Sequence, residues 1–320
     1  MREPPKPVGT DDFERCLAQA AAQSPGDVEG VFGPASAIWL VDREAALFLG
    51  AGRALLMQLA HPWVATAIGE HSAVLADPIG RFHRTFGIMF TLVFGSLPQA
   101  LAAARNLHRR HAGVHGALPE ALGPRHPAGS AYRANDEAAL MWVHATLTDT
   151  ALLAYELVLP PLGAVARERY YGECRRLGLL FGIPVEAQPP DWNSFCRYRD
   201  TTLASPELVV GPAAREIAGS VLAGAGRLPV PRWFGDVTAF LLPDRLRGDF
   251  GLAWGETEQR RAKRALRLIR RTYPLLPRRL RHVGPHQEAQ ARLAGRLRPD
   301  LWTRSLNRLW IGRPAMEKGR

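Results

Sequence analysis

Cysteine is scarce in this chain, and the three that occur lie far apart. Cys16, Cys174 and Cys196 form no CxxC pair, which argues against a disulfide framework and against a zinc ribbon. Unbroken apolar runs of about 18 residues are also missing. Residues 1–12 lack the apolar stretch of a signal peptide. We therefore expect a protein of a reducing compartment and place it in the cytoplasm.

Motifs of several common enzyme classes are absent as well. The sequence has no GxGxxG and no Walker motif for nucleotides, no HExxH for a zinc hydrolase, and no GxSxG for a nucleophilic serine. The paired ExxH motifs of a carboxylate-bridged di-iron bundle are missing too. These absences set aside nucleotide-binding, zinc-hydrolase, serine-hydrolase and di-iron chemistry.

Acidic residues are few near the C-terminal end. From residue 260 onward there are 18 lysines and arginines and three acidic residues, whereas the preceding part has a net charge of −4. Such a segment suits an anionic membrane surface, a nucleic acid or a partner, or it is simply a solvated arginine-rich face. No helix-turn-helix pattern or interleaved aromatic residues accompany it, so we expect no nucleic-acid binding. Peripheral membrane contact stays open.

Alternating strand patterns are nearly absent and helical patterns are frequent, which predicts an all-α fold. We expect a single helical domain with three parts. Residues 1–29 form an N-terminal extension and residues 30–230 the helical core. Residues 231–320 form a basic helical segment that packs on this core.

Local start and stop signals predict the main helices. Asp77 and Pro78 are a typical cap and first residue, so a helix is predicted over residues 78–94, ended by glycine. A serine cap predicts the next helix over residues 97–112, and Asn135 predicts the start of a long apolar helix over residues 136–159. A further helix is predicted over residues 36–60.

Arg81, Arg84 and Thr85 share one face of the predicted helix over residues 78–94, because residues three and four apart are neighbours on a helix. Cations near a helix start are unfavourable by roughly 0.3–1 kcal/mol each. If this face is buried, its fixed charges need an anion opposite, such as a propionate, a phosphate or a carboxylate. The alternative is that both arginines reach solvent.

Three further segments carry residues able to do chemistry. His111 lies in RNLHRRHAGVHG, and His144 lies mid-helix in MWVHATLTDT. Each imidazole is a candidate metal ligand, with an exposed helix end or a satisfied core histidine as the alternative. Glu70, in HPWVATAIGEHS, is a candidate general base or an ordinary surface carboxylate. The residues alone thus indicate an all-α protein with a basic, histidine-containing region suited to an anionic ligand.

In their order along the chain, several motifs resemble those of the rubber oxygenase (latex clearing protein) catalytic-domain family, which includes ER-bound oxygenases of mycophenolic acid biosynthesis. The resemblance covers about residues 30–210. It rests on the stretches HPWVATAIGEHS, DPIGRFHRT, HRRHAGVHG, YRANDEAALMWVHATL and ERYYGECRRLGLLFGIP.

This resemblance implies a globin-like helical core that holds one haem b. Arg81, Arg84 and Thr85 then match the family's basic motif beside the haem, with Arg84 in place of a lysine. His111 is the candidate iron ligand and His144 the second candidate. Glu70 is the candidate catalytic base.

The implied function is a haem-dependent oxygenase that acts with O₂ on a small apolar substrate, an isoprenoid or another alkene. The alternative is a non-catalytic haem- or lipid-binding helical protein associated with anionic membrane surfaces.

Overall fold

The computed structural model describes residues 6–72, 76–224, 230–296 and 298–317. Helices dominate these residues, and a single small sheet pairs β1 (His115–Ala117) antiparallel with β2 (Ala131–Arg133). The predicted all-α fold is confirmed. The small sheet was not predicted, because it lies in a loop rich in glycine, proline and histidine. A globin-like haem-binding core stays a prediction.

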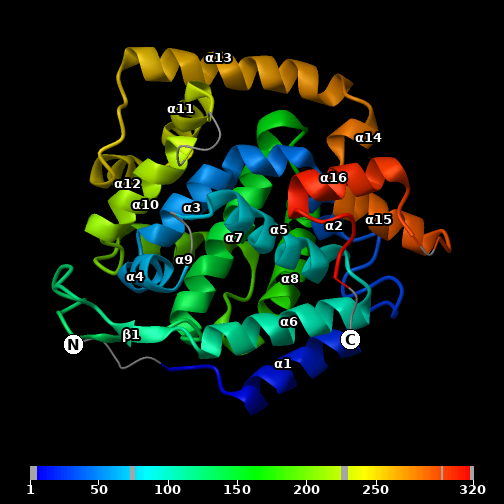
Figure 1. Ribbon diagram of the computed structural model, residues 1–320, viewed down its shortest axis with the longest axis horizontal. Helices are drawn as coiled ribbons and strands as arrows, with labels where there is room; N and C mark the ends of the chain where they lie inside the picture. Colours follow the sequence, from blue (N-terminus) through cyan, green and yellow to red (C-terminus); the bar gives the residue numbers. More distant parts are fainter. Residues whose placement is uncertain (1–5, 73–75, 225–229, 297, 318–320) are drawn as a thin grey trace.

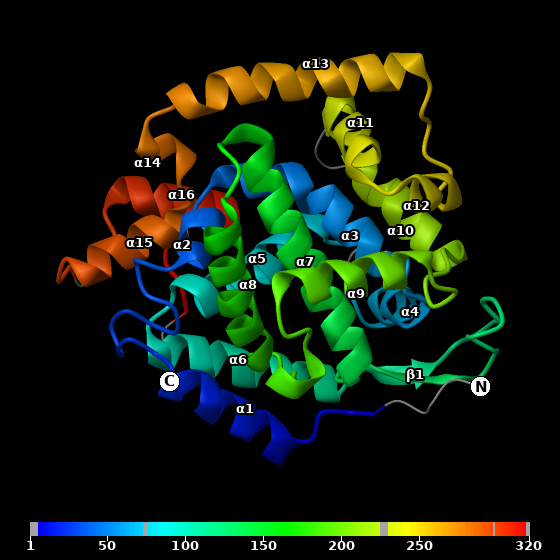
Figure 2. The same ribbon diagram turned by 180° about the vertical axis from the view of Figure 1, so that it is seen from behind.

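The helix α7 (Glu137–Val158) runs through the middle of the molecule (Figures 1 and 2). The sequence predicted its extent closely but placed the cap one residue too early: Asp136, not Asn135, accepts the hydrogen bond from the Ala139 N–H. The elements packed against α7 include η1 (Ala45–Gly50), α3 (Ala51–Leu59), α8 (Ala164–Leu179) and α13 (Glu256–Thr272).

Helices α5 (Pro78–Phe94) and α6 (Leu97–Ala112) have the predicted bounds and pack side by side (Figure 1). Asp77 accepts a hydrogen bond from the Gly80 N–H, and Ser96 forms a capping box with Gln99. A Cβ added at Gly95, between the helices, would lie 2.4 Å from the Thr91 carbonyl oxygen, so a larger residue does not fit there. Local chemistry therefore fixes this tight connection.

The predicted continuous helix over residues 36–60 was wrong. The chain forms α2 (Ala37–Asp42), then η1, then α3. The carbonyl of Arg43 accepts a hydrogen bond from the Val283 N–H, 2.8 Å away. The fully buried Glu44 accepts one from the Tyr273 hydroxyl and pairs with Arg281 at 2.9 Å. Contacts with the C-terminal part of the chain thus replace the helical hydrogen bonds at this point.

The other helices surround this centre (Figures 1 and 2). Helix α4 packs against α3, α10 and β2, α11 packs against α13 and α3, and α15 and α16 pack against α5. The bounds of these and the remaining elements are α1 (Thr10–Ala22), α4 (Pro62–His71), η2 (Val185–Ala187), α9 (Trp192–Ala204), α10 (Pro212–Leu222), α11 (Arg232–Leu241), α12 (Asp244–Asp249), η4 (Tyr273–Leu275), α14 (Arg278–Arg281), α15 (Gly284–Leu293) and α16 (Leu301–Ile311).

The main hydrophobic cluster draws on distant parts of the chain. Phe13 of α1, Phe94 of α5, Val283 before α15 and Ile311 of α16 belong to it. The division into three parts stays a prediction. Among the described residues, no helix combines the length and the apolar character needed to cross a bilayer.

Candidate functional site

A cavity of about 400 Å³ lies between α4, α5, α6 and α7, with β2 and Phe181, just beyond the end of α8, completing its wall. Its volume falls within the range of about 300–1,000 Å³ that is usual for small-molecule sites. The apolar part of the wall includes Trp63, Ile68, Ile88, Leu107, Val143 and Phe181. Val143 belongs to the central helix but is only half-buried, because it faces this cavity.

The polar part of the wall is strongly cationic. Arg81 and Arg84 come from α5, Arg110 from the last turn of α6, and Arg133 from β2. No aspartate or glutamate lines the cavity among the described residues. Arginine stays protonated at every ordinary pH. The cavity therefore favours an apolar ligand that carries negative groups.

Arg81 is half-buried, and its guanidinium donates a hydrogen bond to the Ser72 hydroxyl. No carboxylate forms an ion pair with it in the part of the chain that the structure describes. Burial, together with the nearby charge of Arg84, lowers the pKa of Arg81. A desolvated cation that faces a cavity without a protein counter-ion is suited to an anionic ligand.

Arg84 and Thr85 also line the cavity, as predicted for one helix face, but both are exposed. The Arg84 guanidinium lies 3.1 Å from the carboxylate of Asp77, the residue that caps the same helix. Arg84 therefore already has a counter-ion, and the two arginines of the motif are not equivalent.

His111 lines the cavity from the last turn of α6. Burial lowers its pKa to about 4, the positive charge of His108 adds to this shift, and a side-chain hydrogen bond with Asn135 opposes it. The imidazole is therefore neutral near pH 7, which is the form that binds a metal ion. A hydrogen bond to one ring nitrogen also fixes the orientation of the other.

His144 is buried in α7 and does not line the cavity. Its ring packs against Phe181, with 5.8 Å between the ring centroids, and Phe181 does reach the cavity. Burial lowers the pKa of His144 to about 4. The structure thus brings Arg81, Arg84, Thr85 and His111 to one cavity and leaves His144 behind its wall.

Glu70 lies in the last turn of α4, with about half of its side chain exposed, and is not part of the cavity wall. It accepts a hydrogen bond from the hydroxyl of Tyr132, which does line the cavity. The same hydroxyl oxygen lies 3.0 Å from Nε2 of His71. Burial and the carboxylate of Glu70 raise the pKa of Tyr132, so the phenol keeps its proton. Glu70 therefore meets the cavity wall indirectly, through its hydrogen bond with Tyr132 and through His71, whose Nε2 lies 3.9 Å from its carboxylate.

Sequence reasoning did not single out Tyr132, Arg110 or Arg133. Arg110 is the second arginine of the HRRH run, and the other two residues open the YRAND run. Only the spatial meeting of β2 with α4 and α6 shows that these polar side chains share one cavity with Arg81.

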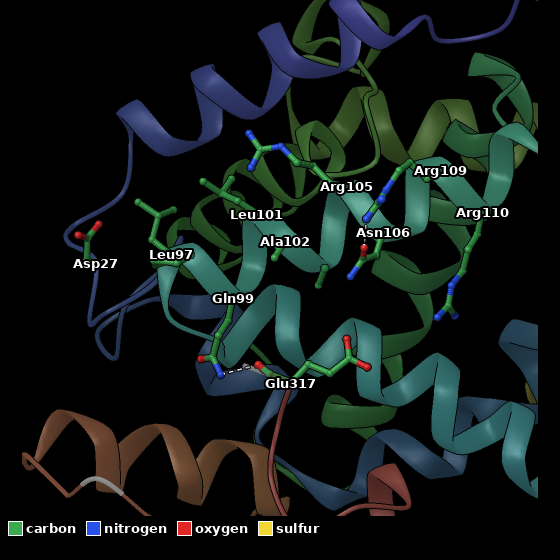
Figure 3. Close-up of a pocket in the computed structure, with 12 residues that line it drawn as sticks. Asp27, Leu97, Gln99, Leu101, Ala102, Arg105, Asn106, Arg109, Arg110 and Glu317 are labelled. Carbon is green, nitrogen blue, oxygen red and sulfur yellow. Dashed lines mark hydrogen bonds between the residues drawn. The ribbon is translucent and has the colours of Figure 1, made fainter. Parts of the chain in front are cut away.

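A second, larger hollow of about 1180 Å³ follows the outer face of α6. Figure 3 shows Arg105, Asn106 and Arg109 projecting from this helix, and Gln99 bonded to the backbone of Glu317. Arg105 is already paired with Glu14 at 2.7 Å. Of the residues in this hollow only Arg110 also lines the first cavity, and none is a predicted site residue.

The described residues contain no group of three or more histidine, cysteine, aspartate or glutamate side chains placed to hold a metal ion. Other histidines already have contacts within the fold. His108 stacks on Phe13 with 4.1 Å between ring centroids. His71, the second imidazole in the cavity wall, lies within hydrogen-bond distance of Tyr132. One remaining imidazole, that of His111, suits a metal whose other ligands come with a cofactor.

Comparison with protein families gives one match. The family described as "ER-bound oxygenase mpaB/B'/Rubber oxygenase, catalytic domain" matches residues 38–271, which include every residue of the cavity. The searches of curated proteins and of solved structures return no match.

Proposed function

Because the chain belongs to the family of ER-bound oxygenase mpaB/B' and rubber oxygenase catalytic domains, we propose that it is a haem b-dependent oxygenase. Its site is the cavity between α4, α5, α6 and α7. The substrate that we propose is a small apolar molecule with a carbon–carbon double bond, which reacts with O₂.

The observation that carries this proposal is that the neutral imidazole of His111 shares one largely apolar cavity with four guanidiniums. Porphyrin brings four nitrogen ligands of its own, so the protein needs to add only one, and His111 is placed for that role. The two propionates of haem b are the anions that Arg81 lacks within the protein. The residues present therefore fit this cofactor.

Each wall of the cavity has a part in the proposed complex. His111 would bind the iron, and Arg81 would bind a propionate, with Arg110 and Arg133 adding positive charge. The side chains of Val143, Leu147 and Phe181 would exclude water from the apolar part of the ligand. When bound, haem supplies an iron with an open position at which O₂ is activated.

The proton chemistry would use Tyr132 and Glu70. Tyr132 lines the cavity, and its hydroxyl already donates to Glu70. It can pass this proton to the carboxylate while its oxygen takes one from a group in the cavity. Glu70 would then act as the base from outside the cavity wall, and His71 would hold the tyrosine oxygen in place.

The many apolar side chains among the described residues of the wall support an apolar substrate. Outside the arginines, the groups that would meet it are mostly aliphatic or aromatic, such as Ile68, Met89 and Leu107. These side chains can bury apolar surface of a ligand but form few hydrogen bonds with it, as expected for a site that binds a hydrocarbon.

Oxygen consumption by the haem-loaded protein with a panel of apolar alkenes tests this proposal. We expect uptake with at least one isoprenoid and none with its saturated analogue. Stoichiometric haem binding without uptake for any alkene would instead support the non-catalytic alternative. Failure to bind haem at all would contradict the proposal.

A further inference from the structure

Large apolar side chains that remain exposed are concentrated in the C-terminal part of the chain. Of the ten among the described residues, seven lie between positions 268 and 309. Leu275 and Leu301 are 81% and 77% exposed. These seven residues are Leu268, Leu275, Leu276, Leu280, Leu301, Trp302 and Leu309.

These side chains lie on neighbouring elements. Leu275 ends η4, Leu280 belongs to α14, and Leu301 and Trp302 begin α16. The indole N–H of Trp302 donates to the Arg279 carbonyl oxygen, 3.4 Å away, which ties the start of α16 to α14. Figure 1 shows α14 between the end of α13 and α16. We call the surface formed by the last turns of α13, η4, α14 and the first turn of α16 the C-terminal surface.

Arginines without ion-pair partners are interspersed with these apolar side chains. On α13, Arg264 and Arg271 flank Leu268 at helical spacing. Arg278 and Arg279 lie beside Leu280. Unlike Arg53, Arg105 or Arg199, none of these four forms an ion pair with a described residue.

We propose that the C-terminal surface docks the protein on an anionic lipid bilayer. Leucine and tryptophan side chains would enter the interface between headgroups and acyl chains, while the guanidiniums bind lipid phosphates. The charge of the surface favours this occupant, because a neutral bilayer or an apolar protein partner gives no reason for arginines without ion pairs beside Leu268 and Leu280.

The surface lies largely outside the matched family domain, which ends at residue 271. Of the seven exposed apolar residues only Leu268 lies within it. Docking is therefore a feature of this chain's own C-terminal part and does not depend on whether the cavity binds haem. For an oxygenase with an apolar substrate, docking would place the protein at the lipid bilayer, in which apolar molecules accumulate.

Co-sedimentation of the full-length protein with vesicles tests this proposal. We expect binding to mixed phosphatidylcholine–phosphatidylglycerol vesicles and little binding to pure phosphatidylcholine. Each arginine removed should weaken partitioning about fivefold, so Arg271→Gln/Arg278→Gln should weaken it about 25-fold. Leu275→Ser/Leu301→Ser should weaken it at least about tenfold. Because all four residues are exposed, the variants should fold normally, as circular dichroism would show.

Arg109→Gln is the matched control, because it removes one exposed charge from α6, on the opposite side of the molecule from α13 (Figures 1 and 2). It should leave partitioning within about twofold of the wild type. Equal binding of neutral and anionic vesicles would overturn the proposal. So would a dimer in lipid-free solution that Leu275→Ser/Leu301→Ser dissociates, since a second copy would then be the occupant.

Discussion

The hydroxyl of Tyr132 lies 3.0 Å from Nε2 of His71 at the cavity wall. Because this hydroxyl donates its own proton to Glu70, its oxygen is free to accept the N–H of His71. The three side chains thus form a directed chain of hydrogen bonds that ends at a partly exposed carboxylate. Two members of the chain, His71 and Tyr132, line the cavity in which a substrate would bind.

Removing the Tyr132 hydroxyl tests the role of this chain. In Tyr132→Phe the carboxylate of Glu70 loses its hydrogen bond with a side chain of the cavity wall, so turnover should fall about a hundredfold or more while haem binding is unchanged. Glu70→Gln should show a similar loss of turnover. Steady-state oxygen uptake, with the absorption spectrum as control, measures both. Full activity in Tyr132→Phe would exclude the proposed proton path.

The two arginines of the α5 motif should differ in their effect on haem affinity. Arg81 forms no ion pair with any residue that the structure describes, whereas Arg84 is paired with Asp77. Arg81→Gln should therefore raise the Kd for haem about tenfold to a hundredfold, and Arg84→Gln should raise it by less. Haem titration of both proteins gives the comparison. An equal loss of haem affinity in the two variants would contradict this expectation, because the ion pair between Arg84 and Asp77 would then have no effect on haem binding.

The buried ion pairs of Asp149 should contribute strongly to the free energy of unfolding. Asp149 of α7 lies 2.6 Å from Arg53 and 2.6 Å from Arg199. Asp149→Asn should lower the free energy of unfolding by about 3–5 kcal/mol, because it leaves a buried guanidinium unpaired. Asp200→Asn is the matched control, because it removes the ion pair between Arg199 and Asp200, whose side chain is 63% exposed. This substitution should lower the free energy of unfolding by less than about 1 kcal/mol. Urea unfolding distinguishes the two.

His286 should make the fold sensitive to acid. Burial lowers its pKa to about 3, with the charges of His282 and Arg43 adding to the shift. In the unfolded chain the imidazole takes up a proton below about pH 6.5, so stability is lost as the pH falls from about 6.5 toward 3. Between about pH 7 and pH 5 the wild type should lose about 2 kcal/mol more than His286→Gln. Parallel urea titrations check this, and identical pH dependence would contradict it.

Local signals predicted the bounds of α5 and α6, two of the helices around the site, well. The caps at Asp77 and Ser96 act through contacts three residues away, so the bounds of α5 and α6 can be read from the sequence. The shared face of Arg81, Arg84 and Thr85 follows from helical spacing in the same way.

Features that depend on distant contacts could not be predicted. The break in the helix expected over residues 36–60 depends on Tyr273, which is 229 positions from Glu44. The contact between Tyr132 and Glu70 spans 62 positions and needs β2 to pack on α4. Helical periodicity carries no information about such pairs. Glu70 could therefore be named as a candidate base from the sequence, but its hydrogen bond with Tyr132 could not be foreseen.

The absorption spectrum of the purified protein, compared with that of His111→Ala and His144→Ala, tests the central claim most directly. The wild type from haem-supplied cells should show a Soret band, because His111 presents a neutral imidazole to a cationic, apolar cavity. His111→Ala should lose or strongly shift this band, and His144→Ala should keep it. A colourless wild-type protein that takes up no added haem, or a band that survives in His111→Ala and vanishes in His144→Ala, would contradict the account.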